Sequence, residues 1–200
     1  MTPDPERVIE LAARTSYKSF DKMGEGSASA LICKLIRSGH ESVLEHAYAT
    51  FRIRGGSRAF THQLVRHRLA SYTQESQRYV DEAGFEYVTP PSVRENPEAL
   101  RIFREAMEGA REAYRKLREF GIPKQDARFV LPNATTSEIV VSANFREWRH
   151  IFELRCHPSA QWEIREICLQ ILKVLKEKAP SVFGDFEIDE ARKVARLEKG

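Results

Sequence analysis

The chain has 200 residues, of which 42% are hydrophobic, and this is enough for a core that folds without disulfide staples. No apolar run approaches the ~20 residues that a membrane-spanning helix needs, and the first ten residues lack the basic and apolar regions of a secretory signal. A cytoplasmic location is therefore expected. The net charge is only +3, but 22 of the 32 basic residues are arginines, which match phosphate and carboxylate groups by geometry. This composition favours a small polyanionic ligand over a long nucleic acid.

The first half of the chain predicts two helices, a strand and a third helix. Asp4 and Pro5 form a typical helix start, and the helix should end near residue 16. Ser27 is predicted to cap the second helix, and Gly39 to end it before a polar corner at residues 40–42. Residues 47–54 alternate between apolar and polar, which predicts a strand before a turn at residues 55–56. A helix should follow from about residue 57, and a polar loop from about residue 71.

The second half predicts a long charged helix and a further strand. Residues 85–88 resemble a short strand, and Asn96 should start a helix that runs to Gly121, with its charges paired along a solvated face. A shorter helix is expected between Pro123 and Pro132, and a strand over residues 135–142. Asn144 should start another helix, and residues 160–178 the last large one, ended by a proline at 180. With no repeat and no clear linker, residues 1–200 are predicted to form one α+β domain.

One segment concentrates groups that bind anions. Arg66, His67 and Arg68 are followed after seven residues by Ser76, and hydroxyl and amide side chains lie between and just beyond them. Guanidinium groups bind phosphate oxygens bidentately, and the neutral donors suit the phosphate and ribose of a nucleotide. The alternative is a solvated basic helix end, but such an end does not need the interleaved tyrosines and glutamines.

This R-H-R-x7-S pattern resembles the signature of the flavin-dependent thymidylate synthases. Further blocks in the order of that family are residues 12–16 (AARTS), 39–46 (GHESVLEH), 127–132 (ARFVLP), 144–146 (NFR), 154–155 (LR) and 160–164 (AQWEI). The resemblance covers most of the chain. It implies an α+β fold with a central antiparallel or mixed sheet and several long helices, which assembles as a homotetramer with composite active sites.

The resemblance also implies the reaction. Deoxyuridine monophosphate (dUMP) is methylated to thymidylate (dTMP) with 5,10-methylenetetrahydrofolate as the carbon donor, and FAD carries the hydride that NADPH supplies. The chain lacks both G-x-G-x-x-G after a strand and the P-loop pattern, so a dinucleotide would have to be held by arginines instead. No metal, nucleic acid or membrane partner is expected.

The family positions give two sets of site residues. For FAD they are Ser16, His40, Ser42, Arg66, His67, Arg68, Gln74, Asn144, Arg146 and His150. For dUMP they are Gln63, Arg66, Gln74, Ser76, Gln77, Arg78, Arg128 and Arg155. The resemblance gives Arg155 the catalytic role, because a guanidinium beside the uracil ring can stabilise negative charge as carbon five becomes nucleophilic. At Gln74 many family members have glutamate and at Gln77 glycine, so the precise roles of these two residues do not transfer.

Other interpretations of the same residues are open. Cys156 beside His157 could be a thiolate nucleophile, although adjacent residues point apart on a helix. The three cysteines of the chain show no CxxC spacing and suggest no disulfide framework. Ser76 could be an activated nucleophile, but no triad is identifiable. A phosphate or sugar hydrogen bond is the simpler role for its hydroxyl.

Three further alternatives concern groups of residues. His40, Glu41, Glu45 and His46 could bind a metal, although their spacing does not place them on one helical face. Trp148, Phe152 and Trp162 could stack on a flavin or pterin ring, or simply belong to the core. A nucleic-acid-binding module would use a phosphate-binding stripe of Arg52, Arg54, Arg58, Arg66 and Arg68.

Overall fold

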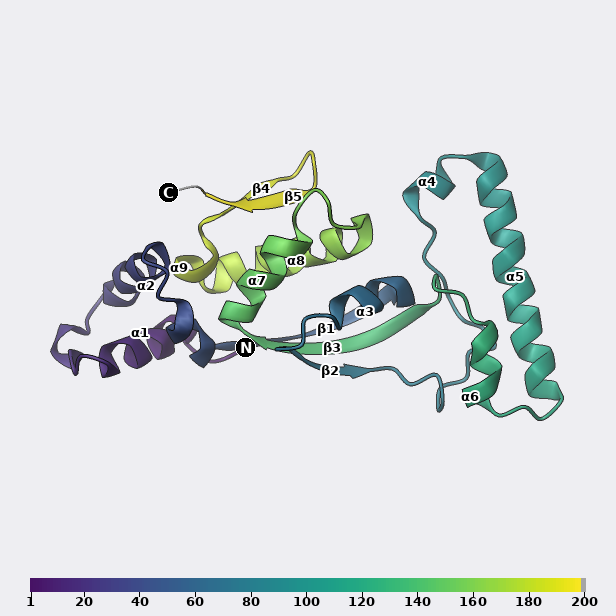
Figure 1. Ribbon diagram of the computed structural model, residues 1–200, viewed down its shortest axis with the longest axis horizontal. Coiled ribbons are helices and arrows are strands. Elements are labelled where there is room, and N and C mark those ends of the chain that lie inside the picture. The colour runs from purple at the N-terminus through teal and green to yellow at the C-terminus, as the bar shows by residue number, and fades with distance from the viewer. Residues whose placement is uncertain (199–200) are drawn as a thin grey trace. The chain divides into compact units, whose positions relative to one another are not determined.

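A computed structural model describes residues 1–198 as an α+β structure of helices and two small sheets, which confirms the α+β part of the predicted fold. Two compact units can be distinguished along the chain (Figure 1). The first consists of Met1–Phe51, Arg66–Ser71 and the chain from Val141 onward; the second consists of Arg52–Val65 and Tyr72–Val140. Among residues 1–198, no helix is both long enough and apolar enough to cross a membrane.

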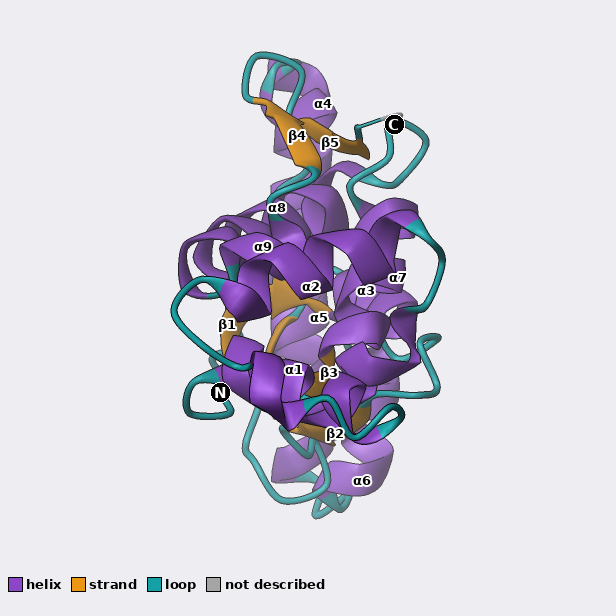
Figure 2. Cartoon of the chain, turned by 90° about the vertical axis from the view of Figure 1, so that its left-hand side faces the viewer, coloured by secondary structure: helices purple, strands orange, loops and turns teal. Residues whose placement is uncertain are grey.

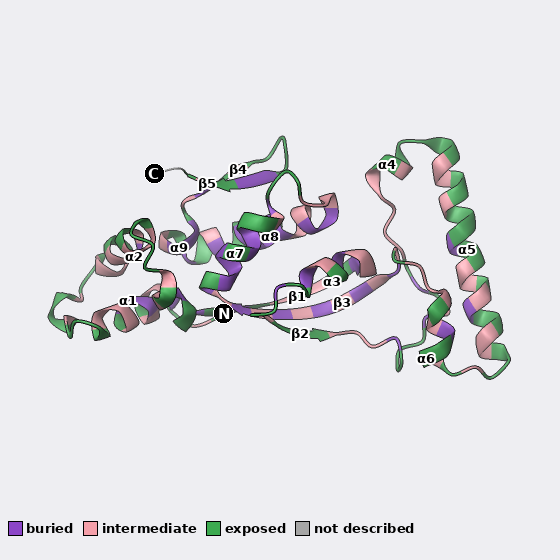
Figure 3. Ribbon diagram, in the orientation of Figure 1, coloured by how far each residue is buried: buried purple, intermediate pink, exposed green. Residues whose placement is uncertain are grey.

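The larger sheet has three strands in the order β1-β3-β2. They span Tyr48–Ser57 (β1), Ser71–Gln74 (β2) and Thr136–Asn144 (β3). Burial alternates residue by residue along the central strand β3, as its β-branched sequence predicts (Figure 3). The loop predicted from residue 71 is thus a strand at its start, and the strand predicted at residues 85–88 is reduced to one bridge between Tyr87 and Thr135.

Strand β1 does not turn at Gly55 and Gly56 but continues to Ser57, so the predicted turn is wrong. Glycine at position 56 is required by side-chain packing and not by a turn. A Cβ atom at this position would lie 2.6 Å from the ring of Phe60, which is fully buried. The glycine therefore allows close approach of helix α3 to the strand that precedes it.

The first unit consists mainly of helices. They are α1 (Pro5–Thr15), η1 (Phe20–Lys22), α2 (Ser27–Arg37), η2 (Glu41–His46), α7 (Phe145–Arg155), α8 (Trp162–Lys178) and α9 (Pro180–Phe183). Two short strands, β4 (Phe186–Asp189) and β5 (Val194–Leu197), form an antiparallel hairpin that the sequence did not predict (Figure 2).

Two predicted helix boundaries in this unit need correction. Ser27 is the first residue of α2 and not its cap; its hydroxyl donates to Glu10 at 2.6 Å and accepts from the N–H of Gly24 at 2.9 Å. The cap position is held by Gly26, whose φ of 73° favours glycine. Pro180 follows the end of α8 as expected, but it also starts the short helix α9.

The core of the first unit is an aromatic cluster around helix α7. Trp148 stacks on Phe152 with ring centroids 5.7 Å apart, and Phe152 makes edge contacts with Phe183 and Phe186, each at 5.9 Å. The indole of Trp148 donates to the carbonyl of Ala49 at 3.2 Å. Trp148 and Phe152 are fully buried, so these two rings belong to the core and not to a ligand site.

Helix α7 also carries a buried charge. Arg149 is only 2% exposed and donates to both carboxylate oxygens of Asp185 at 2.7 Å, and to the carbonyl of Val182. Its Nε lies 3.5 Å from a carboxylate oxygen of Glu41. One side chain thus ties α7 to the segment before β4 and to η2.

The second unit contains α3 (Arg58–Leu64), α4 (Pro91–Arg94), α5 (Pro97–Glu119), α6 (Lys124–Ala127) and η3 (Arg128–Val130). Asn96 caps α5 by accepting from two backbone N–H groups, as predicted. Its charges pair at spacings of three and four residues, for example Arg101 with Glu98 and with Glu105. These pairs confirm the prediction that the charges of α5 pair with one another along a solvated face.

Candidate active site

In the first unit, residues 66–70 form a loop that contacts helix α7. Arg66 and Arg68 are exposed, but His67 between them is only 5% exposed. The loop is closed by a hydrogen bond from the N–H of Ala70 to the carbonyl of His67, at 3.1 Å. The chain therefore directs two arginines to solvent and one imidazole inward.

His67 contacts Arg155, the residue to which the resemblance assigns catalysis. The Nε of Arg155 donates to Nε2 of His67 at 2.9 Å. Burial, the charge of Arg155 and the neighbouring His150 lower the pKa of His67 to about 4. His67 is therefore neutral near pH 7. Because Nε2 accepts a hydrogen bond from a guanidinium, which can only donate, we place the single ring proton on Nδ1.

Glu147 lies on the other side of this imidazole. Its carboxylate oxygen is 3.7 Å from Nδ1 of His67, and its side chain is only 5% exposed. Burial raises the pKa of Glu147, and His150 partly offsets that effect. Arg155, His67 and Glu147 thus form a continuous line of polar groups in the first unit.

A hollow of about 620 Å³ opens over this line. It is lined by Arg66, His67, Arg68, Leu69, Glu147, His150, Leu154 and Arg155. Three guanidinium groups against one carboxylate make the lining basic, which suits a phosphorylated ligand. The structure thus brings the R-H-R triplet, His150 and Arg155 together.

A second hollow, of about 630 Å³, shares Leu69, Glu147 and His150 with the first. Its remaining lining consists of Glu41, Glu45, Asn144, Arg146 and Glu153, which makes it acidic. Asn144 caps α7 by accepting from the N–H of Glu147 at 2.8 Å, and Arg146 pairs with Glu45 at 2.5 Å. Asn144 and Arg146, both predicted FAD residues, therefore line this hollow and also stabilise local structure.

The remaining FAD residues of the first unit line neither hollow. His40 and Ser42 are exposed at the start of η2, whose contribution to the lining comes from Glu41 and Glu45. Ser16 is exposed at the end of α1. The structure of this chain does not bring these three side chains to the R-H-R loop.

The second unit contains the rest of the predicted set. Gln74 on β2 donates from its amide nitrogen to Thr61 Oγ1 at 3.1 Å and to Ser137 Oγ at 3.2 Å. The single hydroxyl proton of Thr61 is already donated to the carbonyl of Arg58, so Thr61 can only accept from residue 74. An amide at residue 74 can make this donation, whereas a carboxylate could not.

The other predicted nucleotide residues have simpler contacts. Gln63 on α3 donates to the carbonyl of Ala59 at 3.2 Å, and Ser76 Oγ accepts from the N–H of Arg78 at 3.3 Å. The guanidinium of Arg78 is exposed and lies over the ring of Tyr79, 5.4 Å from its centroid. The loop at residues 76–80 thus presents a hydroxyl and a guanidinium to solvent.

Arg58 is a candidate residue that the motif did not indicate. Burial and the charge of Arg128 lower its pKa, whereas Glu82 and Glu75 act in the opposite direction. Two half-buried guanidinium groups thus lie close enough to repel each other, a repulsion that a bound anion would relieve. Gln77 is 7% exposed, and its side chain hydrogen-bonds to Glu82, which partly offsets the effect of burial on the pKa of that carboxyl. The only signal in the sequence was the position of Arg58 in the arginine stripe.

The alternative interpretations gain little support. Cys156 is fully buried, which raises the pKa of its thiol to about 12, so it does not supply a thiolate. In the proposed nucleic-acid stripe, Arg52 and Arg54 share one carboxylate, Glu138, at 2.5 and 3.3 Å, which offsets part of their charge. Within residues 1–198, no group of three or more His, Cys, Asp or Glu side chains is arranged to bind a metal.

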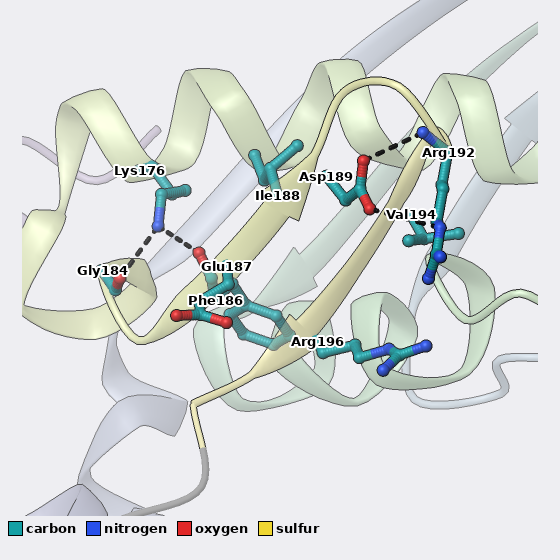
Figure 4. A pocket seen from close by; sticks show the side chains of 9 residues that line it. All are labelled: Lys176, Gly184, Phe186, Glu187, Ile188, Asp189, Arg192, Val194 and Arg196. Carbon is teal, nitrogen blue, oxygen red and sulfur yellow. Dashed lines mark hydrogen bonds and ion pairs between the residues drawn. The ribbon is translucent and has the colours of Figure 1, made fainter.

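The hairpin forms another hollow, of about 610 Å³, which is not a good ligand site (Figure 4). Lys176 donates to the backbone carbonyls of Phe183, Gly184 and Phe186, and Arg192 lies 3.8 Å from Asp189. These charges stabilise the hairpin itself.

Comparison with known proteins gives a consistent result. A family described as thymidylate synthase complementing protein matches residues 1–181. A relative from Geobacter sulfurreducens, named flavin-dependent thymidylate synthase, is 47% identical and covers 92% of this chain and 83% of its own length. Relatives of the same name from Corynebacterium glutamicum and Pyrococcus abyssi are each 43% identical; the alignments cover 92% and 88% of this chain, and 80% and 77% of those proteins.

Proposed function

This chain belongs to the thymidylate synthase complementing protein family, and we propose that it is an FAD-dependent thymidylate synthase. It would reductively methylate dUMP to dTMP, with 5,10-methylenetetrahydrofolate as carbon donor and NADPH as reductant. The relatives bear the name of an enzyme that depends on a flavin.

One observation carries the proposal: the basic hollow over Arg155. The Nε of Arg155 is held by a neutral imidazole at 2.9 Å, and Arg66 and Arg68 line the same hollow. Three guanidinium groups that line one hollow give it a positive charge, which suits an anionic ligand. Such a fixed charge can stabilise the negative charge that develops on a uracil ring when carbon five attacks the methylene donor.

The residues also fit FAD. Its diphosphate is anionic and suits the basic hollow of Arg66, His67 and Arg68, whereas the hydroxyl and amino groups of its sugars and adenine suit the acidic hollow of Asn144, Arg146 and His150. Bound FAD would supply hydride transfer from NADPH. Ser16, His40, Ser42 and Gln74 would complete the FAD site from neighbouring copies of a homotetramer, in which residues 1–200 of each copy act as one domain.

For dUMP we propose a division of roles. Arg128, with Arg58 beside it, and Arg78 would bind the phosphate, while Ser76 and the amides of Gln63, Gln74 and Gln77 would bind the ribose and the base edges. Arg66 and Arg155 would complete the set, with Arg155 acting on the ring. No cysteine of the enzyme would form a bond to the nucleotide, in agreement with the buried thiol of Cys156.

A visible spectrum combined with a product assay tests the proposal. The purified protein should contain FAD or take it up, NADPH should bleach the flavin bands, and dTMP should form only when dUMP and methylenetetrahydrofolate are both present. A colourless protein that refuses FAD and makes no dTMP would contradict the proposal. Tight, salt-dependent binding of oligonucleotides by such a protein would support the nucleic-acid alternative instead.

A further inference from the structure

In the second unit, the loop that follows β2 carries Ser76 and Arg78 on one short turn. The backbone N–H groups of Tyr79 and Val80 both donate to the carbonyl of Ser76, at 3.0 and 2.9 Å. The N–H of Arg78 donates to Ser76 Oγ at 3.3 Å. The outer side chains give the turn little packing, because Tyr79 is 73% exposed and Val80 is 40% exposed. The place of this turn therefore depends strongly on contacts of its backbone.

Lys124, at the start of α6, makes such a contact. Its ammonium group donates to the carbonyl of Tyr79 at 2.9 Å, and its side chain is half-buried. A lysine at the carboxyl end of a helical turn can bind the last carbonyl groups in this way. The donor is charged, which makes the hydrogen bond stronger than one between neutral groups.

Lys124 and Arg128 lie on the same side of α6. They are four residues apart, and residues at this spacing are neighbours on the surface of a helix. The Nε of Arg128 donates to the carbonyl of Gln125 at 3.1 Å, which fixes the guanidinium on its own helix. The turn that Lys124 binds is therefore held at the side of α6 that bears Arg128.

We propose that Lys124 is a positioning residue that holds the turn of residues 76–80 against α6, so that Arg78 reaches the same phosphate group as Arg128. The inference rests on the proposed function, in which both arginines bind the phosphate of dUMP. Two segments far apart in the sequence would then form one phosphate site, and Lys124 would set the distance between them. Without its ammonium group the turn would move away from α6, although every group that binds the ligand would still be present.

Other contacts hold the same loop, but they act at different places. The side chain of Gln77 is hydrogen-bonded to Glu82, so this contact links the loop to itself. The N–H of Glu82 donates to the hydroxyl of Tyr114 on α5 at 3.3 Å, which fixes the loop beyond the turn. Neither contact sets the distance between the turn and α6, which the side chain of Lys124 spans.

The test uses three variants of the full chain. Lys124→Met removes the donor and keeps an apolar stem, whereas Lys124→Arg keeps a charged donor. The matched control is Lys116→Met, which removes a lysine of the same unit that lies 3.4 Å from Glu112 on α5. Hydrogen exchange of peptides that cover residues 76–82, followed by mass spectrometry, reports opening of the turn. Steady-state kinetics at varied dUMP are measured on the same samples.

In Lys124→Met we expect amide exchange in the turn to become about fivefold faster and KM for dUMP to rise about fivefold, the size typical of losing one hydrogen bond. The kcat at saturating dUMP should change less than about twofold, because the groups that act on the ring are unaltered. Lys124→Arg and Lys116→Met should both remain within about twofold of wild type in exchange rate and in KM.

A second comparison separates positioning from direct binding. If Lys124 acts through Arg78, Lys124→Met should raise KM by only about twofold or less in a protein that already carries Arg78→Ala, because the effects of coupled residues are not additive. The same fivefold rise in both backgrounds would show that Lys124 binds the nucleotide itself, and this would overturn the inference.

Unchanged exchange in Lys124→Met, or faster exchange with an unchanged KM, would also overturn the inference. If wild type makes no dTMP, the proposed function fails. The exchange measurement then still decides whether Lys124 holds the turn, because it needs no nucleotide and no turnover.

Discussion

Of the three arginines on helix α7, Arg149 and Arg155 lie six residues apart and have different surroundings. Arg149 is buried, bound at both nitrogen ends by Asp185, and lies near a second carboxylate on Glu41. Arg155 is half-buried, and its Nε is bound by an imidazole that is neutral near pH 7. The carboxylates of Asp185 and Glu41 compensate the charge of Arg149, whereas the Nε of Arg155 is oriented by a neutral imidazole.

The difference shows how one helix can combine structural and ligand-binding arginines. A carboxylate partner satisfies the guanidinium and cancels its charge, which suits a link between segments. A neutral imidazole satisfies one donor and leaves the charge, which suits an anionic ligand or transition state. The type of partner, more than burial alone, separates the two roles.

The largest expected effect comes from removing the ligand-facing arginine. Arg155→Ala should lower kcat about 100-fold or more even at saturating dUMP, because a fixed charge on the developing anion is lost. The melting temperature should change by only a few degrees. The contrasting variant Arg78→Ala should mainly raise KM for dUMP. Equal and mild effects of both substitutions on steady-state kinetics would contradict the assigned roles.

The structural arginine should show the opposite pattern. Arg149→Met should lower the free energy of unfolding by about 3 kcal/mol, because Asp185 loses its buried partner. Urea denaturation of the flavin-free protein measures the loss. Arg146→Met, which breaks the exposed pair with Glu45, is the control and should cost about 1 kcal/mol or less. Equal losses of unfolding free energy in the two variants would show that the buried ion pair contributes no more to stability than the exposed one.

A residue without charge, Gln74, offers a further test of how a polar side chain depends on the chemical type of its partner. Gln74→Glu should destabilise the protein by about 1–3 kcal/mol, since a carboxylate cannot donate to Thr61, whose own proton is committed to a carbonyl. Thr73→Glu, at the exposed neighbouring position of β2, serves as the control for added negative charge. A stable Gln74→Glu protein in the same denaturation assay would show that this polar network rearranges easily.

The smallest expected effect is a dependence of stability on pH. The pKa of His67 is about 4 in the folded protein and about 6.5 in the unfolded chain, so the unfolded chain binds more protons between these values. This contribution to stability is complete above pH 6.5 and decreases as the pH falls toward 4. The raised pKa of Glu147 acts in the opposite direction over its own range.

The measurement compares wild type with His67→Gln. Wild type should lose stability relative to this variant as the pH falls from about 6.5 to about 4. The free energy of unfolding is measured by urea denaturation at each pH. If it changed in parallel with pH in the two proteins, the imidazole would not be protected from protonation in the folded state.

Much of the fold could be predicted because the local signals agree with the tertiary structure. Asn96 and Asn144 both cap helices as their types suggest, and the β-branched run of β3 forms a strand. The errors have tertiary causes. Gly55 and Gly56 suggest a turn, but Gly56 instead makes room for the ring of Phe60. The β4–β5 hairpin is too short to give a clear periodic signal.

The candidate site was only partly predictable. The R-H-R triplet and Arg155 were identified through the resemblance, and the structure brings them together around one hollow. Glu147 and Arg58 were not identified, because their significance depends on contacts with residues far away in the sequence. No local pattern reveals that a buried glutamate lies beside a particular imidazole.

Asp185 lies four positions beyond the segment that the family pattern covers, which ends at residue 181. A version trimmed to that segment would lose Asp185, which binds both nitrogen ends of Arg149, and also Phe183 and Phe186 of the aromatic cluster. We therefore expect a version that ends at residue 181 to be less stable than one that extends through β4.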